Sequence, residues 1–550
     1  MTLLDSIGVD VLRHRLEGVA QAMQGALLRS AHSPIVKEGM DASACLFDPQ
    51  GQALAQSQSI PLHLGALIPA VAAILARFPV AGMADGDLYL LNDPFAGGTH
   101  LPDFTLLRPI LLDGRPVALA ASMLHHQDVG GLRPGSVPAD AREIFHEGLR
   151  IPALKLGCED RPEPALLRLL CLNSRTPAVM EGDLGAQIAA AVTAARAVRE
   201  IAAEIGAAAF ADGAARLLDR TEAAVRQVLR ELPDGCYRGR DALDDDGVDS
   251  GVPVPVEVMV EVAGDRLVVD FAGSAAQVTG PVNSVRSGPL AAALYALLSL
   301  APRGTPANGG ALRALDLRLP ERSVVNAAAP AAVNGRMATV RLCMSAILQA
   351  VAQASAGRMP AANAGMSLVL AFSGAWPDGR PFMFGEIVAG GAGGGPHADG
   401  AEAVSTDVGN AMNMPAEMLE AAAPLRVLDL GLREGSGGAG TWRGGLGIRR
   451  SYEALVDGIA VTHRGERFRS QPAGTAGGGA PAPARAWVTT AEGQERPLTS
   501  KCSLVLNRGD RLTVETCGGA GYGDPAARAA DAAAADRAAG KAGQSGGRAG

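Results

Sequence analysis

The sequence predicts a mixed α+β (mixed α/β) fold that is divided into several domains. The chain has 550 residues, of which 48% are hydrophobic and 19% are charged, so it can bury more than one core. Hydrophobic residues recur at helical spacing in some stretches and alternate with polar residues in others. The 69 glycines and 35 prolines indicate many turns between these elements. This composition excludes a disordered chain and a coiled coil.

Residues 1–160 are predicted to form an N-terminal α/β part. Residues 6–31 carry apolar side chains three and four positions apart and predict one amphipathic helix. Two short apolar runs flank a Pro/Gly turn at 48–51 and predict a β-hairpin, because these two residues supply turn geometry. The other elements expected in this part are a helix over about 64–77 and strands near 88–91, 104–112 and 116–124.

The next two parts are predicted to be helical (161–233) and then mixed α/β (234–425). Alanine, arginine and glutamate dominate the first, where two helices are expected between 188 and 229 with a break near Asp212-Gly213. From about 235 the pattern changes to the alternation that is typical of strands. The elements expected there are helices near 286–300 and 336–356 and strands near 254–262, 267–271, 312–319, 367–373 and 382–388.

The C-terminal region is predicted to be rich in short strands joined by glycine-rich turns, over residues 426–525. The glycine run at 437–447 resembles a dinucleotide-binding fingerprint, but no strand–glycine–helix unit surrounds it, so a turn-rich β segment is the interpretation that we prefer. The last segment, 526–550, consists mainly of alanine, glycine, arginine and aspartate without a large apolar residue. It predicts a disordered tail.

Charge and cysteine usage restrict the partners and the compartment. The net charge of −8 speaks against an electrostatic nucleic-acid footprint. Seven scattered cysteines without a C-x-x-C motif predict neither a disulfide framework nor a zinc ribbon, and they favour a reducing cytosol. The N-terminus is charged where a signal peptide is apolar, and the most apolar stretch, 60–76, is shorter than a membrane span. We expect a soluble cytoplasmic protein that binds no nucleic acid and no membrane.

Histidines gather in two loops that each follow a predicted strand. His100 stands in G-G-T-H-L-P-D, and His125 and His126 begin H-H-Q-D-V-G-G. Two imidazoles and the carboxylate of Asp103 can hold a divalent metal and leave positions open for water or substrate. Such a metal lowers the pKa of bound water or polarises a carbonyl. The alternative is that these are ordinary loop histidines that are hydrogen-bonded to the backbone.

Adjacent histidines in an extended segment point in opposite directions, so at most one of His125 and His126 is expected at the same ion. Asp93 and Asp128 are either orienting partners of the ligands or turn formers. The sequence contains no G-x-x-x-x-G-K-[ST], no G-x-S-x-G and no H-E-x-x-H. A phosphate loop, a serine hydrolase and a zincin therefore find no support.

Eight motifs in order resemble the hydantoinase B/oxoprolinase family, and they cover the whole chain except the tail. They are S-P-I-V-K-E-G-M-D-A-S (33–43), I-P-L-H-L-G-A (60–66), N-D-P-F-A-G-G-T-H-L-P-D (92–103), H-H-Q-D-V-G-G-L-R-P-G-S (125–136), E-I-F-H-E-G-L-R-I-P (143–152), D-F-A-G-S-A-A-Q-V-T-G-P-V-N (270–283), G-G-A-G-T-W-R-G-G-L-G (437–447) and G-G-A-G-Y-G-D-P (518–525).

The resemblance implies a beta-type subunit of an ATP-dependent enzyme that acts on cyclic amides or on ketones. In such enzymes an actin-like A subunit binds ATP and activates the substrate by phosphorylation, and the B-type subunit carries a metal site and completes the reaction. The expected partners are a hydantoinase A-type subunit, in a hetero-oligomer, and a small-molecule substrate. ATP is then bound by the partner subunit. A 5-oxoproline substrate would place the chain in glutathione metabolism.

Carried over by resemblance, the catalytic and metal-binding positions fall on His100, Asp103 and one of His125 or His126, with His125 preferred. Two histidines and a carboxylate suit zinc, manganese and iron alike, so the metal is left open. The other residues that stand on matching motifs, in a supporting or a structural role, are His63, Lys37 and Glu38.

The chain departs from the family pattern at three places. N-G-N-V-E-T-S is replaced by N-G-R-M-A-T-V at 334–340, an Asn-Asn pair by Asn363-Ala364, and Tyr-Tyr-Glu by Phe384-Gly385-Glu386. These polar losses indicate a changed substrate pocket. We expect hydrolysis of a hydantoin or a 5-oxoproline-like lactam. The alternatives are a subunit of an ATP-dependent ketone carboxylase, related to acetone and acetophenone carboxylases, and a non-catalytic scaffold for the A subunit.

Overall fold

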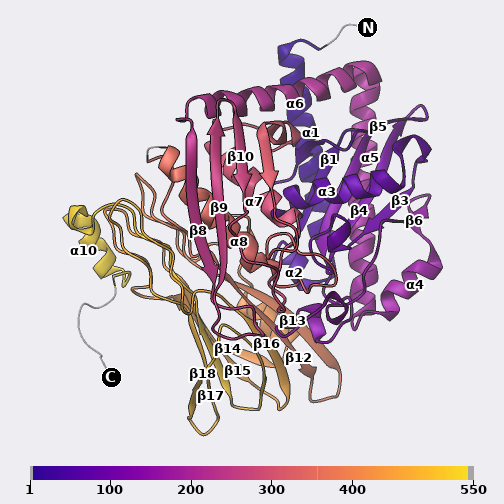
Figure 1. Cartoon of the computed structure of the whole chain (residues 1–550). Helices are drawn as coiled ribbons and strands as arrows, with labels where there is room; N and C mark the ends of the chain where they lie inside the picture. Colours follow the sequence, from indigo (N-terminus) through magenta and orange to yellow (C-terminus); the bar gives the residue numbers. More distant parts are fainter. Residues whose placement is uncertain (1–3, 356, 543–550) are drawn as a thin grey trace.

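Four β-sheets and the helices that flank them make up the protein, in a computed structural model that describes residues 4–355 and 357–542 (Figure 1). The first sheet comes from the N-terminal quarter of the chain, the second from the middle, and the other two from the C-terminal part. This arrangement confirms the mixed α+β fold that the sequence predicts.

The N-terminal sheet has seven antiparallel strands in the order β2-β1-β5-β4-β3-β6-β7. Its strands are β1 (Ala42–Phe47), β2 (Ala53–Gln56), β3 (Leu88–Leu91), β4 (Asp103–Leu112), β5 (Arg115–His125), β6 (Leu154–Cys158) and β7 (Arg161–Pro162). The helices before and between them are α1 (Ser6–Ser30), α2 (Pro34–Lys37) and α3 (Pro61–Arg77). The predicted first helix, hairpin and strands are confirmed, with shifts of a few residues at their ends.

Helices cover both faces of this sheet. Leu107 and Met123 pack with α3 on one face, whereas Leu106 and Leu124 pack with α1 on the other. Because successive side chains of a strand point to opposite faces, a sheet buried on both faces needs apolar residues at nearly every position. This requirement explains the continuous apolar runs of β4 and β5.

Three helices follow: α4 (Pro164–Leu172), α5 (Pro177–Ile205) and α6 (Ala207–Arg230). The break between the last two falls at Gly206, which has a φ of +86°, so the predicted break near Asp212-Gly213 is wrong. Gly213 instead lies inside α6, where an added Cβ would come within 2.6 Å of the Leu12 Cδ2 atom of α1. This glycine therefore serves close helix packing rather than a helix end.

The second sheet has the order β11-β10-β9-β8, with β8 (Gly235–Leu243), β9 (Val254–Ala263), β10 (Arg266–Asp270) and β11 (Leu315–Arg318). Helices α7 (Ser287–Leu300) and α8 (Arg336–Ala354) lie between this sheet and α3, so the middle and N-terminal parts share one apolar cluster. Among the described helices, α8 alone is long and apolar enough to cross a membrane, and 67% of its apolar stretch is buried in the protein.

The C-terminal sheets face each other across an apolar core that includes Phe372, Phe384 and Tyr452. One sheet has the order β13-β12-β16-β19 and the other β14-β15-β20-β17-β18. Their elements are β12 (Ser367–Ala375), β13 (Pro381–Ala389), β14 (Leu425–Leu432), β15 (Ile448–Ala454), β16 (Ile459–Arg464), β17 (Arg485–Thr489), β18 (Glu495–Pro497), β19 (Lys501–Leu506) and β20 (Arg511–Glu515), with helix α9 (Ala416–Ala422). Strands β12 and β16 pair directly across the predicted boundary at 425, and the division into five domains stays a prediction.

The glycine run at 437–447 leads into strand β15 and not into a helix, which confirms the predicted turn-rich β segment. Its glycines allow the backbones of two loops to touch. A Cβ added at Gly444 would lie 1.9 Å from the carbonyl oxygen of Gly519, and one at Gly445 would lie 1.9 Å from that of Ala401. Backbone contact, rather than nucleotide binding, accounts for these glycines.

Residues 526–542 form ordered structure, so the predicted disordered tail is wrong for this stretch. Helix α10 (Ala530–Ala538) follows a short turn, and Arg528 joins it to the body of the protein. The Arg528 guanidinium contacts Asp399 at 2.8 Å and Asp536 at 2.5 Å, and Lys541 contacts Glu402 at 2.7 Å. Ion pairs, rather than apolar contacts, hold this segment against the body of the protein. The remaining part of the predicted tail, 543–550, lies outside the described residues.

A buried ion pair joins the two C-terminal sheets. Arg450 Nη1 lies 2.6 Å from Glu386 Oε1, and the Tyr452 hydroxyl donates to Glu386 Oε2 at 2.7 Å. Replacing Arg450 by leucine is expected to lower the free energy of unfolding by about 3–5 kcal/mol at pH 8, because it leaves an uncompensated buried charge. Urea denaturation of the variant and of wild type measures this difference.

The decrease in the free energy of unfolding caused by Arg450→Leu should be smaller at pH 6 than at pH 8. Burial raises the pKa of Glu386 to about 7, above its value in an unfolded chain, so the folded protein takes up a proton as the pH falls. The stability that this proton provides is lost as the pH rises through about 7. The control is Arg449→Leu, next along β15, whose side chain is exposed and pairs with Asp429, and which should cost under about 1 kcal/mol. Equal losses in the two variants would contradict the prediction.

Candidate metal centre

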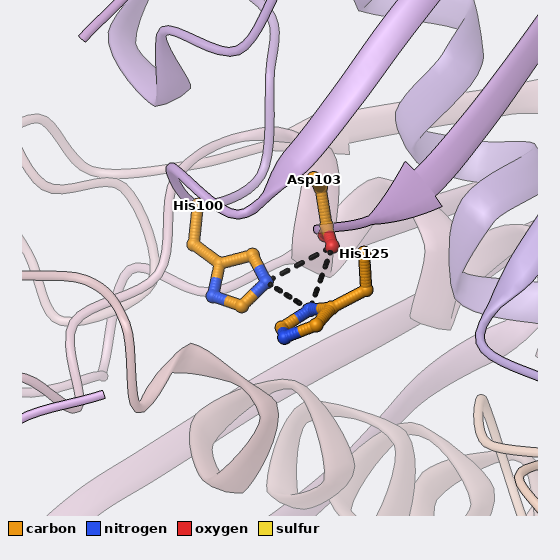
Figure 2. A group of neighbouring side chains, drawn as sticks. All are labelled: His100, Asp103 and His125. Carbon is orange, nitrogen blue, oxygen red and sulfur yellow. Dashed lines mark hydrogen bonds and ion pairs between the residues drawn. The ribbon is translucent and has the colours of Figure 1, made fainter. Parts of the chain in front are cut away.

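His100, Asp103 and His125 converge at one end of the N-terminal sheet (Figure 2). Asp103 begins β4 and His125 ends β5, and the antiparallel register places these two residues directly opposite each other. His100 lies three residues before Asp103, in the turn that leads into β4. Strand pairing thus brings together three side chains from the two loops that the sequence singles out.

The three donor atoms form a nearly equilateral triangle. Asp103 Oδ1 lies 3.0 Å from His100 Nε2 and 3.2 Å from His125 Nδ1, and the two nitrogens are 3.2 Å apart. One N–H group donates a well-aligned hydrogen bond to one acceptor, so hydrogen bonds alone do not account for three mutual contacts among these atoms. Ligands that lie about 2.1 Å from a shared cation are about 3.0–3.4 Å from one another. The geometry therefore fits a divalent metal.

The second oxygen of Asp103 is held by other groups. Arg336 Nη2 donates to Oδ2 at 2.6 Å, and the Thr99 hydroxyl donates to the same oxygen. Oδ1 is thus left to face the two histidines. Such outer hydrogen bonds fix the orientation of a ligating carboxylate.

The ionisation states of Asp103 and His100 suit cation binding, whereas at His125 the hydrogen bond to Asp103 and the Asp41 charge outweigh burial and raise the pKa, so a metal there would displace a proton. Burial favours a neutral acid at Asp103, but the Arg336 charge and the hydrogen bonds from His100 and His125 outweigh it and hold the pKa of Asp103 well below its usual range. Burial and the neighbouring Arg336 lower the pKa of His100 to about 3, so its imidazole is neutral. A carboxylate and a neutral imidazole both offer lone pairs to a metal.

Asp41 is a further candidate that the sequence analysis did not assign. Its Oδ2 atom lies 3.9 Å from His125 Nδ1, and its Oδ1 atom lies 3.6 Å from His63 Nε2. It immediately precedes β1, which pairs with β5, and its carbonyl accepts a hydrogen bond from the His125 backbone. Its place in the motif K-E-G-M-D-A-S, shortly before the first apolar run of the predicted hairpin, is the signal that could have revealed it. His63 in turn contacts Ser43 Oγ at 2.8 Å.

His126 points away from the cluster. Its Nε2 atom lies 3.3 Å from Gln187 Oε1 on α5, and its ring packs against Phe104. Burial lowers the pKa of His126 to about 4. The alternation of side chains along β5 thus separates the adjacent histidines, and His125 alone of the two faces Asp103.

The other sequence candidates have structural surroundings. Asp93 accepts a hydrogen bond from the Phe95 backbone and forms an ion pair with Arg150. Asp128 accepts hydrogen bonds from the backbone N–H groups of Gly130 and Gly135, and it forms an ion pair with Arg175. Both aspartates therefore act as turn formers. Lys37 and Glu38, at the end of α2, make no hydrogen bond or ion pair to the cluster in the part of the chain that the structure describes.

The cluster opens into a cavity of about 120 Å³ between the N-terminal sheet and strands β12 and β13. Val369, Met383 and Ile387 contribute an apolar wall opposite the histidines. An apolar cavity of about 150 Å³ can hold benzene, so this one has the size for a single small ring. Arg336, the most evident departure from the family pattern, also lines the cavity.

Comparison with known proteins identifies relatives along the whole chain. Residues 5–525 match the family described as hydantoinase B/oxoprolinase. An uncharacterised protein of Methanocaldococcus jannaschii is 32% identical over 526 residues, which cover 95% of this chain and 91% of that protein. The caprolactamase subunit beta of Pseudomonas jessenii is 31% identical over 540 residues, or 96% and 92% of the two chains. The 5-oxoprolinase of Dictyostelium discoideum is 29% identical, but the match covers 95% of this chain and only 40% of that protein.

Solved structures share the fold. The ATP-dependent caprolactamase of Pseudomonas jessenii superposes with a TM-score of 0.90 at 29% identity, over 98% of this chain and 95% of the other. The nucleotide-free acetone carboxylase superposes with a TM-score of 0.88 at 20% identity, over 98% and 78% of the two chains. At that identity the second match establishes the fold alone.

Proposed function

The chain belongs to the hydantoinase B/oxoprolinase family, and we propose that it is the B-type subunit of an ATP-dependent enzyme that opens the ring of a cyclic amide. The substrate class is a hydantoin or a lactam such as 5-oxoproline. The observation that carries this proposal is the triangle of His100, Asp103 and His125 at a cavity for one small ring, in a chain whose relatives include a caprolactamase subunit.

A separate subunit is proposed to supply the driving force. Ring opening of an unactivated cyclic amide is nearly balanced, so transfer of a phosphoryl group from ATP to the amide oxygen makes hydrolysis favourable. This chain carries no phosphate-loop motif in its sequence, and the caprolactamase relative is named as one subunit of an enzyme. We therefore place ATP on a hydantoinase A-type partner in a hetero-oligomer. The scattered cysteines support a cytoplasmic location.

The residues of this chain are proposed to position the scissile carbonyl. A divalent zinc, manganese or iron ion held by His100 Nε2, Asp103 Oδ1 and His125 Nδ1 would lower the pKa of the water that attacks the activated ring carbon. Arg336 holds Asp103 in one orientation through the second carboxylate oxygen, and Asp41 offers a fourth donor atom, an oxygen. The apolar wall on β12 and β13 limits the access of bulk water to the ring.

Coupled turnover tests the proposal. Co-expressed with its A-type partner, the chain should open 5-oxoproline, hydantoin or caprolactam with one ADP formed per ring opened, and neither subunit should do so alone. Product chromatography and a coupled ADP assay measure the two events. Bicarbonate-dependent incorporation of labelled carbon into a ketone would instead assign a carboxylase, and a partner that is fully active alone would assign a scaffold. Either result overturns ring opening as the function.

A further inference from the structure

Three arginine side chains, Arg336, Arg341 and Arg464, line the cavity beside the candidate metal centre. The Nε atom of each is buried and has no hydrogen-bond partner within the described residues. Burying a cation in a largely apolar cavity is unfavourable unless an anion compensates it. The charges that surround each arginine therefore show whether an anion is missing.

Arg336 and Arg341 each make hydrogen bonds to neighbouring groups. Arg336 donates to Asp103 at 2.6 Å. Arg341 donates to the Thr406 carbonyl at 2.9 Å and to Ser405 Oγ at 3.2 Å, and burial lowers its pKa although the Asp407 charge opposes this.

Arg464, like Arg341, has only neutral hydrogen-bond partners among the described residues. Its Nη1 atom donates to the side-chain oxygen of Asn334, and Asn334 Nδ2 donates to Glu147 Oε1 at 2.9 Å. Glu147 thus reaches Arg464 only through a neutral amide. Across residues 4–355 and 357–542, no carboxylate oxygen lies within 4.0 Å of the Arg464 guanidinium.

The acidic groups that line the cavity are engaged elsewhere. Glu386 is bound by Arg450 and the Tyr452 hydroxyl, and Asp41 faces His63 and His125. With a divalent cation on the triangle, the cation, Arg336 and Arg464 carry four positive charges. Asp41, Asp103 and Glu147 carry three negative charges at most, because burial raises the pKa of Glu147 to about 7. The loaded site therefore lacks at least one negative charge.

We propose that Arg464, with Arg336 in the same cavity wall, binds an oxyanion of the ligand, so that the cavity takes a cyclic amide with an anionic group next to the ring. This inference rests on the proposed function and narrows its substrate class. Guanidinium groups bind carboxylate and phosphoryl oxygens alike, through parallel N–H donors. The oxyanion is either a carboxylate carried by the substrate or the phosphoryl group that activates it.

Equilibrium binding to the purified full-length chain loaded with Zn²⁺, the state in which the negative charge is missing, tests the inference without ATP or partner. The probes for isothermal titration are 5-oxoproline, 2-pyrrolidinone, which is the same ring without the carboxylate, and inorganic phosphate. We expect 5-oxoproline or phosphate to bind at least about tenfold more tightly than 2-pyrrolidinone. The preference for 5-oxoproline identifies a substrate carboxylate, and binding of phosphate alone identifies the phosphoryl group.

Variants assign this binding to Arg464. Arg464→Gln should abolish the tenfold preference and leave the affinity for 2-pyrrolidinone unchanged, whereas Arg464→Lys should retain part of it. The control is Arg469→Gln, on the loop that follows β16, with an exposed side chain outside the cavity; this variant should bind like wild type. Thermal unfolding checks that Arg464→Gln folds. If Arg464→Gln does not fold, the preference of the wild-type chain for the anionic probe and the reduction of that preference in Arg464→Lys test the inference instead.

Two results would overturn the inference: no anion binds more tightly than 2-pyrrolidinone, or Arg464→Gln keeps the wild-type preference. Both are independent of turnover. Anion binding that depends on Arg464, in a chain that supports no ATP-coupled ring opening with its partner, would refute the proposed function and leave the anion site standing.

Discussion

Replacing His125 by glutamine is expected to remove the divalent cation from the purified chain and to slow ring opening by at least about 10²–10³-fold. The His125 Nδ1 atom is one of three donors that lie 3.0–3.2 Å apart, and a site with two remaining donors binds a divalent cation weakly. The slower ring opening follows from the loss of the cation that lowers the pKa of the attacking water. Metal content by plasma mass spectrometry and turnover with the partner subunit measure the two effects. His100→Ala should behave in the same way.

The adjacent histidine provides a matched control. His126→Gln changes the same residue type one position after the end of β5, where the side chain points away from the cluster and lies against Gln187 and Phe104. This variant should keep its metal and most of its turnover, with at most a lower thermal stability. Full metal content in His125→Gln, or metal loss in His126→Gln alone, would exclude the assigned ligand set.

The contrast between these two histidines shows how far sequence reasoning reaches. Alternation along a strand predicts that only one of them meets a given ion, which is a local property of an extended backbone. Which one it is depends on the pairing of β4 with β5, since Asp103 stands opposite His125. That register is set by the packing of both sheet faces and cannot be deduced from a single motif.

Long-range contacts account for what the sequence analysis did not foresee. Arg336 lies 233 positions from Asp103 along the chain, and Arg464 lies 130 positions from Asn334. The substitution at 336 was evident as a departure from the family pattern, but its contact with a candidate ligand was not. The ordered tail has the same explanation, since Arg528 is held by Asp399, 129 positions earlier.

Glycine gave both correct and wrong predictions, for one physical reason. The Pro/Gly turn at 48–51 separates β1 from β2 as predicted, because Gly51 has a φ of +82° that a turn requires. Gly213 was expected to end a helix and instead lies where α6 touches α1. A sequence shows that a glycine is present, but not whether the chain needs its backbone freedom or its lack of a side chain.

A glycine of the second kind has a large expected effect on stability. Gly65 lies in α3, and a Cβ added there would lie 2.4 Å from the Cα atom and 2.7 Å from the backbone nitrogen of Ala291 in α7. Gly65→Ala is expected to lower the free energy of unfolding by about 3 kcal/mol, because backbone atoms cannot move aside as a flexible side chain does. The midpoint of urea denaturation measures the loss.

Gly18→Ala is the control for this effect. Gly18 also lies inside a helix, α1, but nothing comes within 4 Å of an added Cβ, so alanine should stabilise the protein by up to about 1 kcal/mol through its higher helix propensity. The two variants make the same chemical change and should shift the midpoint in opposite directions. The separation of α3 from α7 in Gly65→Ala should also displace His63, two residues earlier, and with it the position of Asp41. A Gly65→Ala protein as stable as wild type would show that α3 and α7 do not meet at this point.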